Sequence, residues 1–184
     1  MALVTTLPHG LPLTRADLDA MPDDGHRYEL IDGVLVVSPS PSWHHQRAVG
    51  RLFRLLDDMC PPELEVLSGP FDVSLADDTV MIPDLLVARR SDLTQRDLPT
   101  APLLAVEVLS PSTRRFDLLT KRSRYESSGT ASYWVVDPVE PSLTAWELHG
   151  GALVEVANVR HDELFTTRTP YPVEVVPAAL VADR

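Results

Sequence analysis

The stretch from residue 103 to residue 125, LLAVEVLSPSTRRFDLLTKRSRY, decides the predicted fold, because a strand, a break and a helix follow one another in it. Leu103–Leu109 is an apolar run typical of a buried strand, with Glu107 inside it. A carboxylate in a buried strand costs several kcal/mol unless another group compensates its charge. Glu107 therefore needs a partner, and a cluster of basic residues follows it closely.

This strand begins a strand–helix–strand unit. Residues 110–112 end the strand, and a helix is predicted from there to about Ser127, with Gly129 as its C-cap. Tyr133–Asp137 follows as a further buried strand. Since a crossover helix joins parallel strands, the pattern predicts an α/β fold with a mixed central β-sheet flanked by helices.

Local signals predict the remaining elements. Apolar runs around Asp32-Gly33, and again around His149-Gly150-Gly151, are typical of hairpins. A helix over roughly Trp43–Met59 has an apolar stripe at helical spacing and stops at two prolines. Further expected elements are a short helix from Arg15 to about Met21 capped by Thr14, and strands at Leu64–Leu67, Phe71–Leu75 and Val80–Ala88.

The length of 184 residues predicts a single domain over residues 1–184, with a core of about residues 10–160. The Pro-rich tail from Thr166 onward is expected to cover the sheet edge. The single cysteine, Cys60, excludes an internal disulfide and any zinc or iron–sulfur site built from several cysteines. No run is long enough for a membrane span and no signal peptide is recognisable, so a cytoplasmic protein without membrane association is expected.

The formal net charge of −11 argues against broad electrostatic adhesion to nucleic acid or to an anionic membrane. The charge is unevenly distributed, however. Five basic residues lie between Arg114 and Arg124 against the single acid Asp117, a local charge of +4. This cluster is the segment best suited to a phosphate backbone, and pairing two such faces in a homodimer would strengthen it.

Asp84 and Glu107 are the candidate metal ligands. Asp84 follows Pro83 and opens a buried strand, the apolar strand that precedes the strand of Glu107. If the two strands are neighbours, both carboxylates come within a few ångströms of each other. Two carboxylate donors, completed by a main-chain carbonyl and waters, suit Mg²⁺. Taken alone, Asp84 is more commonly explained as part of a Pro-Asp turn that opens a strand.

Lys121 lies on the helix after Glu107 and has two interpretations. It pairs with Asp117 on the helix surface, or it reaches back to the carboxylates, where it positions a water or stabilises a phosphate transition state. Tyr125 lies one turn further on the same face. In a purely structural interpretation, Glu107 is instead the buried partner of Arg114 or Arg115.

These residues resemble the PD-(D/E)XK nuclease superfamily, in the branch called the Uma-two family of putative restriction endonucleases, over roughly residues 10–160. The resemblance is carried by four phrases: Arg27-Tyr28-Glu29-Leu30-Ile31-Asp32-Gly33, Pro83-Asp84-Leu85-Leu86-Val87, Val106-Glu107-Val108-Leu109-Ser110-Pro111-Ser112-Thr113 and Tyr133-Trp134-Val135-Val136-Asp137-Pro138. The sequence departs from the superfamily in one place, because Leu109 occupies the position of the motif lysine. The resemblance implies that Lys121 replaces that lysine.

The resemblance implies a restriction-endonuclease-like core and a Mg²⁺-dependent endonuclease, with Mn²⁺ as a possible substitute and DNA as the substrate. Asp84 and Glu107 would hold the metal with the Val108 carbonyl, Lys121 would position the nucleophile, and Glu29 would be an additional acidic member of the site. The residues expected to contact the substrate are Arg114, Arg115, Tyr125, His45 and Gln46. The alternative function is a nuclease-fold protein that no longer cuts and acts as a binding module, which the acidic composition and Leu109 favour.

Overall fold

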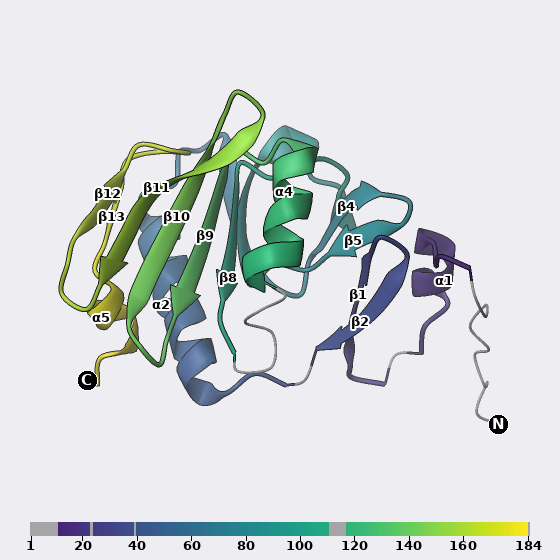
Figure 1. Cartoon of the computed structure of the whole chain (residues 1–184), viewed down its shortest axis with the longest axis horizontal. Helices are drawn as coiled ribbons and strands as arrows, with labels where there is room; N and C mark the ends of the chain where they lie inside the picture. Colours follow the sequence, from purple (N-terminus) through teal and green to yellow (C-terminus); the bar gives the residue numbers. More distant parts are fainter. Residues whose placement is uncertain (1–10, 23, 39, 111–116, 184) are drawn as a thin grey trace.

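The computed structural model describes residues 11–22, 24–38, 40–110 and 117–183 (Figure 1). Its largest sheet has six strands in the order β11-β10-β9-β8-β6-β3. These strands are β3 (Leu64–Ser68), β6 (Leu85–Arg89), β8 (Leu104–Val108), β9 (Ser132–Asp137), β10 (Ser142–His149) and β11 (Ala152–Arg160). The pair β8–β9 is parallel and the other pairs in this sheet are antiparallel, so the predicted mixed sheet is confirmed.

The connection from β8 to β9 is helical, which confirms the strand–helix–strand unit. Its described part consists of a π-helical segment, η2 (Asp117–Lys121), followed by the helix α4 (Arg122–Ser128). Gly129 ends α4 in the left-handed conformation, with φ of 84°, as the sequence predicts. The predicted start of this helix lies outside the described residues.

A second sheet of five strands, in the order β2-β1-β5-β4-β7, lies beside the first (Figure 1). Its strands are β1 (Arg27–Ile31), β2 (Val34–Ser38), β4 (Asp72–Ala76), β5 (Thr79–Met81) and β7 (Asp97–Leu98). The hairpin predicted at Asp32-Gly33 joins β1 to β2, with positive φ values of 53° and 73° at the two turn residues. Such a turn matches the twist of the strands it joins. The second predicted hairpin, β10–β11, also forms, with strands longer than expected.

The prediction of one strand over Val80–Ala88 is wrong. The structure divides this run into β5 and β6, which belong to different sheets. Pro83 lies between them and has no N–H to donate to a sheet. The chain therefore crosses from the five-stranded to the six-stranded sheet at residues 82–84, and Asp84 stands at the crossing.

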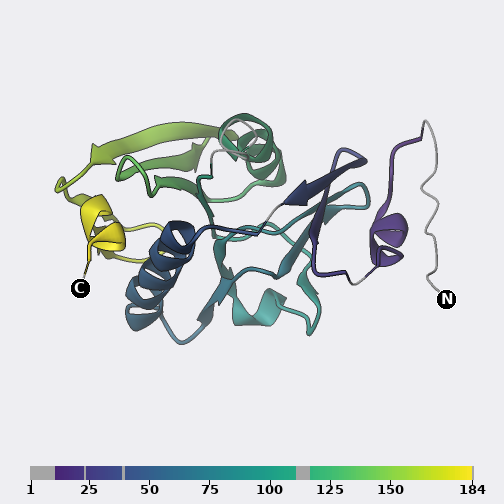
Figure 2. The same cartoon turned by 90° about the horizontal axis from the view of Figure 1, so that it is seen from below.

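Helices cover both faces of the six-stranded sheet, as Figure 2 shows. The helix α2 (Trp43–Asp58) buries Ala48, Leu52 and Leu56 against one face, and α4 packs Tyr125 against the other. The prediction that the tail covers the sheet edge is incomplete. The tail forms β12 (Phe165–Thr167), β13 (Val173–Val175) and α5 (Pro177–Val181), and its apolar side chains join the core on the face covered by α2.

The short helix α1 (Arg15–Asp19) precedes β1 and ends two residues earlier than predicted. The predicted cap at Thr14 forms a capping box with Asp17, whose carboxylate accepts hydrogen bonds from the Thr14 backbone N–H and hydroxyl. Among the helices described, none combines the length and the hydropathy required to cross a membrane.

Candidate active site

Asp84 and Glu107 come from adjacent strands. Strands β6 and β8 are antiparallel, with Leu85 opposite Val106. Asp84 directly precedes Leu85 and Glu107 directly follows Val106, so continuing this register brings the two acidic residues to neighbouring positions. The backbone N–H of Val108 donates to Asp84 Oδ2 at 2.8 Å, which ties Asp84 to β8. The expected adjacency of the two strands is therefore confirmed.

Asp84 is buried, and three groups compensate its charge. Besides the N–H of Val108, His45 Nε2 lies 3.1 Å from Asp84 Oδ2, and the guanidinium of Arg27 lies 3.5 Å from Oδ1. Burial by itself would raise the pKa of this carboxyl, but the hydrogen bond and charge of His45, the Val108 N–H and Arg27 together lower the pKa below its ordinary value of 3.8. Asp84 is therefore held as an anion.

Among the described residues, Lys121 is a partner of Glu107. Lys121 Nζ lies 3.1 Å from Glu107 Oε1 and 2.9 Å from Glu29 Oε1, so one ammonium joins two carboxylates. The three residues are 4%, 3% and 1% exposed, respectively, which makes this a buried ionic cluster. Glu29 is held further by the backbone N–H of Ile82, which donates to its Oε1 at 2.7 Å. Of the two interpretations of Lys121, the structure shows the one in which it reaches the carboxylates.

Lys121 is the only lysine in the sequence, and every other residue counted as basic is an arginine. Lysine is among the residue types most rarely buried in proteins. A surface charge could be supplied by arginine, which the chain uses elsewhere. The single lysine is instead buried where a compact ammonium with three donors fits between two carboxylates.

The backbone at Lys121 has an uncommon form. Lys121 ends the π-helical segment η2, and ordinary α-helix begins at Arg122. A π-helical turn shifts the side chains that follow it relative to an ideal α-helix, and such turns are frequent at functional sites. The segment η2 therefore gives Lys121 a direction that uniform α-helical spacing would not predict.

The donor chemistry of this region fits a hard divalent cation. In the part of the chain that the structure describes, no three His, Cys, Asp or Glu side chains are grouped so as to hold a metal ion. Magnesium, however, is commonly held by one or two carboxylates and completes its shell with water. The predicted ligands, Asp84, Glu107 and the main-chain carbonyl of Val108, all offer oxygen donors, and their role in holding a metal stays a prediction.

Other residues expected to contact substrate have different positions. Arg114 and Arg115 lie outside the described residues. Tyr125 has no exposed surface, and its ring packs 5.1 Å from that of Tyr133. Substrate contact by Tyr125 stays a prediction, and the packing gives this residue a role in the core. His45 contacts Asp84, and Gln46 lines a neighbouring cavity.

The described members of the predicted basic cluster are engaged within the protein. Lys121 is buried, Arg124 pairs with Asp32 at 2.8 Å, and the Arg122 guanidinium lies 5.4 Å from the centre of the Trp146 ring. Lys121 therefore does not contribute to an open basic surface, whereas Arg122 and Arg124 are partly exposed and each has a partner within the protein.

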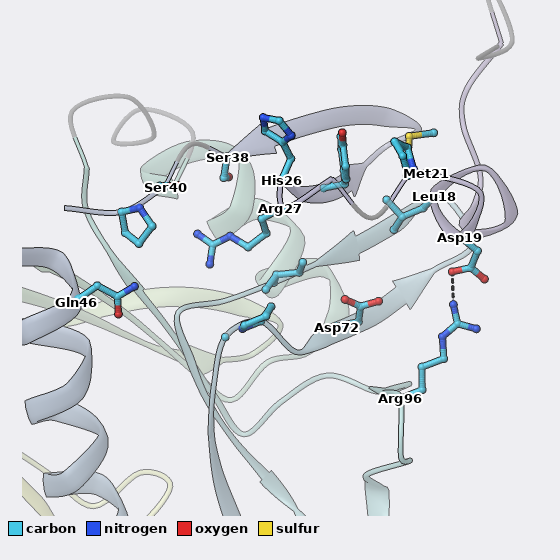
Figure 3. Close-up of a pocket in the computed structure, with 17 residues that line it drawn as sticks. Leu18, Asp19, Met21, His26, Arg27, Ser38, Ser40, Gln46, Asp72 and Arg96 are labelled. Atoms are coloured by element: carbon cyan, nitrogen blue, oxygen red, sulfur yellow. Dashed lines mark hydrogen bonds and ion pairs between the residues drawn. The ribbon is translucent and has the colours of Figure 1, made fainter. Parts of the chain in front are cut away.

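Sequence reasoning missed Arg27 as a member of the site. Arg27 and Glu29 are two residues apart in β1, so their side chains point to the same face of the strand. From that face Arg27 reaches Asp84. The spacing of two residues between Arg27 and Glu29 was the sequence signal that could have identified Arg27 as a member of the site. Arg27 also lines an open cavity of about 790 Å³. Figure 3 shows Arg27 from β1 and Gln46 from α2 extending toward the same part of this cavity.

Two of three comparisons with known proteins agree with this architecture. The chain matches the family Uma2, described as "Putative restriction endonuclease", over residues 15–177. It shares its fold with the crystal structure of a putative nuclease belonging to DUF820 from Anabaena variabilis ATCC 29413. The TM-score is 0.68 at 17% sequence identity, over 85% of this chain and 89% of the other. No curated protein matches the chain significantly.

Proposed function

Because the chain belongs to the Uma2 family of putative restriction endonucleases, we propose that it is a metal-dependent endonuclease that hydrolyses phosphodiester bonds in DNA. The observation that carries this proposal is the position of the only lysine, buried within 3.1 Å of Glu107 and 2.9 Å of Glu29. A carboxylate pair on adjacent strands with an ammonium beside it meets the needs of phosphodiester hydrolysis.

Asp84 and Glu107, with the Val108 carbonyl, would hold Mg²⁺ or Mn²⁺, which when bound neutralises phosphate charge and lowers the pKa of a bound water. The protein's own residues prepare this site. His45 and the Val108 N–H hold Asp84 in its ionised form and fix the direction of its carboxylate. Lys121 brings a positive charge to Glu107, where it orients the attacking water or stabilises the negative charge of the transition state.

Glu29 acts on Lys121. Its carboxylate is fixed by the Ile82 N–H, so it holds the ammonium at a defined position. An ammonium held at this position could stabilise the charge of a phosphate. In this proposal Glu29 is a positioning residue, and substitution by glutamine weakens cleavage less than substitution of Glu107.

DNA is the proposed substrate, and the net charge of −11 requires that binding rest on a small number of specific contacts. We propose Arg27 as one of them, because its side chain is part exposed, lines the open cavity and lies beside Asp84. We also propose that the protein forms a homodimer and is located in the cytoplasm. Sedimentation in the presence and absence of DNA tests the dimer.

A plasmid-nicking assay with Mg²⁺ or Mn²⁺ tests the activity. The wild type is expected to nick supercoiled DNA, and Asp84→Ala, Glu107→Gln and Lys121→Ala are each expected to abolish nicking. Glu140→Gln is a matched control, since Glu140 is exposed and lies at the turn after β9. Undiminished nicking by the site variants contradicts the proposal, and absence of nicking by the wild type on many substrates favours the binding-module alternative.

Metal binding has an independent readout because the chain has one lysine. Protein labelled with ¹³C-lysine gives a single set of side-chain signals, all from Lys121. Adding Mg²⁺ is expected to shift the ε-carbon signal in the wild type and in Glu140→Gln, and to leave it unchanged in Asp84→Asn. An unchanged signal in the wild type at millimolar Mg²⁺ would contradict metal binding beside Lys121.

A further inference from the structure

The first turn of α2 carries an exposed ring stack. The rings of Trp43 and His44 stack with their centres 3.6 Å apart, and the guanidinium carbon of Arg47 lies 4.5 Å from the centre of the Trp43 ring. Trp43 is 58% exposed, whereas Trp134 and Trp146 are 0% and 5% exposed. Trp43 is thus a large aromatic side chain that the core does not use, and both Trp43 and His44 are exposed.

Contacts to the C-terminal segment hold this stack in place. Arg47 NH1 donates to the carbonyls of Val181 and Ala182 at 3.2 Å and lies 2.8 Å from the Asp183 carboxylate. These bonds fix the guanidinium that supports Trp43. A ring held in place before binding loses little conformational freedom when a ligand stacks on it.

The stack adjoins the candidate active site. His45, the residue after His44, turns inward to Asp84 at 3.1 Å. Gln46, the next residue, lines the cavity of about 790 Å³ together with Ser40, Pro41 and Arg27 (Figure 3). A single helical turn therefore presents one histidine to a proposed metal ligand, one glutamine to the cavity and two exposed aromatic rings to solvent.

We propose that Trp43 and His44, supported by Arg47, form a stacking platform for an unpaired base of the substrate, so that the substrate class is single-stranded or locally unpaired DNA. The inference rests on the proposed function. Bases inside a duplex already stack on their neighbours and cannot cover another ring, whereas unpaired bases stack readily on aromatic side chains. Stacking also needs no positive surface, which suits a chain with a net charge of −11.

Binding without cleavage tests the platform. In buffer with EDTA, fluorescence anisotropy of a labelled twelve-nucleotide oligo-dT is compared with that of the same strand paired to oligo-dA. The wild type is expected to bind the single strand more tightly than the duplex, and oligo-dT is expected to quench its tryptophan emission. Trp43 is the reporter, since the other two tryptophans are buried.

Substitutions at position 43 separate stacking from other contacts. Trp43→Ala is expected to weaken oligo-dT binding by about tenfold, to leave duplex binding unchanged and to remove the quenching. Trp43→Phe keeps a ring and is expected to retain most of the affinity. Leu164→Ala, a substitution at a 54% exposed apolar residue just before β12, is the matched control and is expected to bind as the wild type does.

Three outcomes would overturn the platform: equal wild-type affinity for single strand and duplex, unchanged oligo-dT binding by Trp43→Ala, or an altered sedimentation coefficient of Trp43→Ala without DNA. The last would mark Trp43 as a contact between copies of the chain. Because the assay needs no cleavage, its failure is distinguishable from failure of the nicking assay. Loss of nicking in Asp84→Ala with unchanged oligo-dT binding in Trp43→Ala would reject the platform alone.

Discussion

The charges around Lys121 make it the residue whose loss should be most costly to stability. Replacement by methionine keeps most of the side-chain volume but leaves Glu29 and Glu107 buried without their shared ammonium. Removing one partner of a buried ion pair destabilises a protein by about 3–5 kcal/mol. We expect a loss of this size in the free energy of unfolding of Lys121→Met, measured by urea denaturation at pH 7.

A triple variant separates this electrostatic cost from lost packing. Lys121→Met combined with Glu29→Gln and Glu107→Gln also removes the two carboxylate charges that Lys121 balances, and most of the lost stability is expected to return. A triple variant as unstable as Lys121→Met would show that packing, and not charge, accounts for the loss. The triple variant is expected to remain inactive, because the lysine and the carboxylates are all absent.

The lowered pKa of Asp84 predicts that the stability of the protein depends on pH. Folding lowers its pKa below the ordinary value of 3.8, so its ionised form stabilises the fold at every pH above 3.8. This contribution is lost as the pH falls through the lower, folded pKa. Asp84→Asn is therefore expected to be less stable than the wild type at pH 7, with a difference that shrinks below pH 3.8. Metal-free urea denaturation across this range is the measurement, and a constant difference would contradict it.

At the scale of elements, the hairpin β1–β2 positions Glu29 and Arg27, and Gly33 permits its turn. Gly33 has a φ of 73°, and an added Cβ would lie 2.4 Å from Pro12 Cβ and 2.8 Å from Pro12 Cα. Gly150 in the other hairpin has a φ of 60° but nothing within 4 Å of an added Cβ. The two glycines therefore share the conformational requirement and differ in their surroundings.

Alanine substitutions at these two glycines form a matched pair. Gly150→Ala is expected to cost about 1–2 kcal/mol, the cost of a left-handed conformation in a residue with a Cβ. Gly33→Ala is expected to cost more and also to weaken nicking, because Pro12 must move and the hairpin that carries Glu29 moves with it. Thermal denaturation and the plasmid assay measure both effects, and equal losses in the two variants would refute the role of Pro12.

At the scale of the whole molecule, the C-terminal segment completes the core and is not a loose cover. Leu180 is 2% exposed within the same cluster as Leu52 and Trp134, whereas Leu164 is 54% exposed. Leu180→Ala is expected to destabilise the protein by about 2–5 kcal/mol and Leu164→Ala by about 0.5 kcal/mol or less. Chemical denaturation compares them, and similar small losses would contradict the assignment of α5 to the core.

The sequence predicted features that depend on near neighbours in the chain. The turn at Asp32-Gly33 has the residue types of its conformation, α2 has an apolar stripe at helical period, and the β8–β9 pair follows from a strand, a helix and a strand in succession. Asp84 and Glu107 were found as candidates because a polar residue is conspicuous in an apolar strand. Their roles in a metal site stay predictions.

Other features depend on contacts between distant residues, and these were missed or left open. Pro83 is a local signal that the run Val80–Ala88 is interrupted, and it was overlooked. The assignment of the two halves to different sheets depends on the distant strands with which they pair. The membership of Arg27 in the site depends on how the five-stranded sheet lies against β6. Five basic residues in eleven positions suggested a surface, but burial and pairing of the described members are decided by their neighbours in space.

By itself, the sequence determined the class of fold, most elements and the two carboxylates on adjacent strands, because turn chemistry, hydrophobic period and strand order act over short distances along the chain. Only the tertiary structure decided what Glu107 faces. It faces Lys121, which also holds Glu29 from the other sheet. A buried charge takes whatever partner the packing of distant segments brings within hydrogen-bonding distance, and that choice is made when the two sheets and the helix come together.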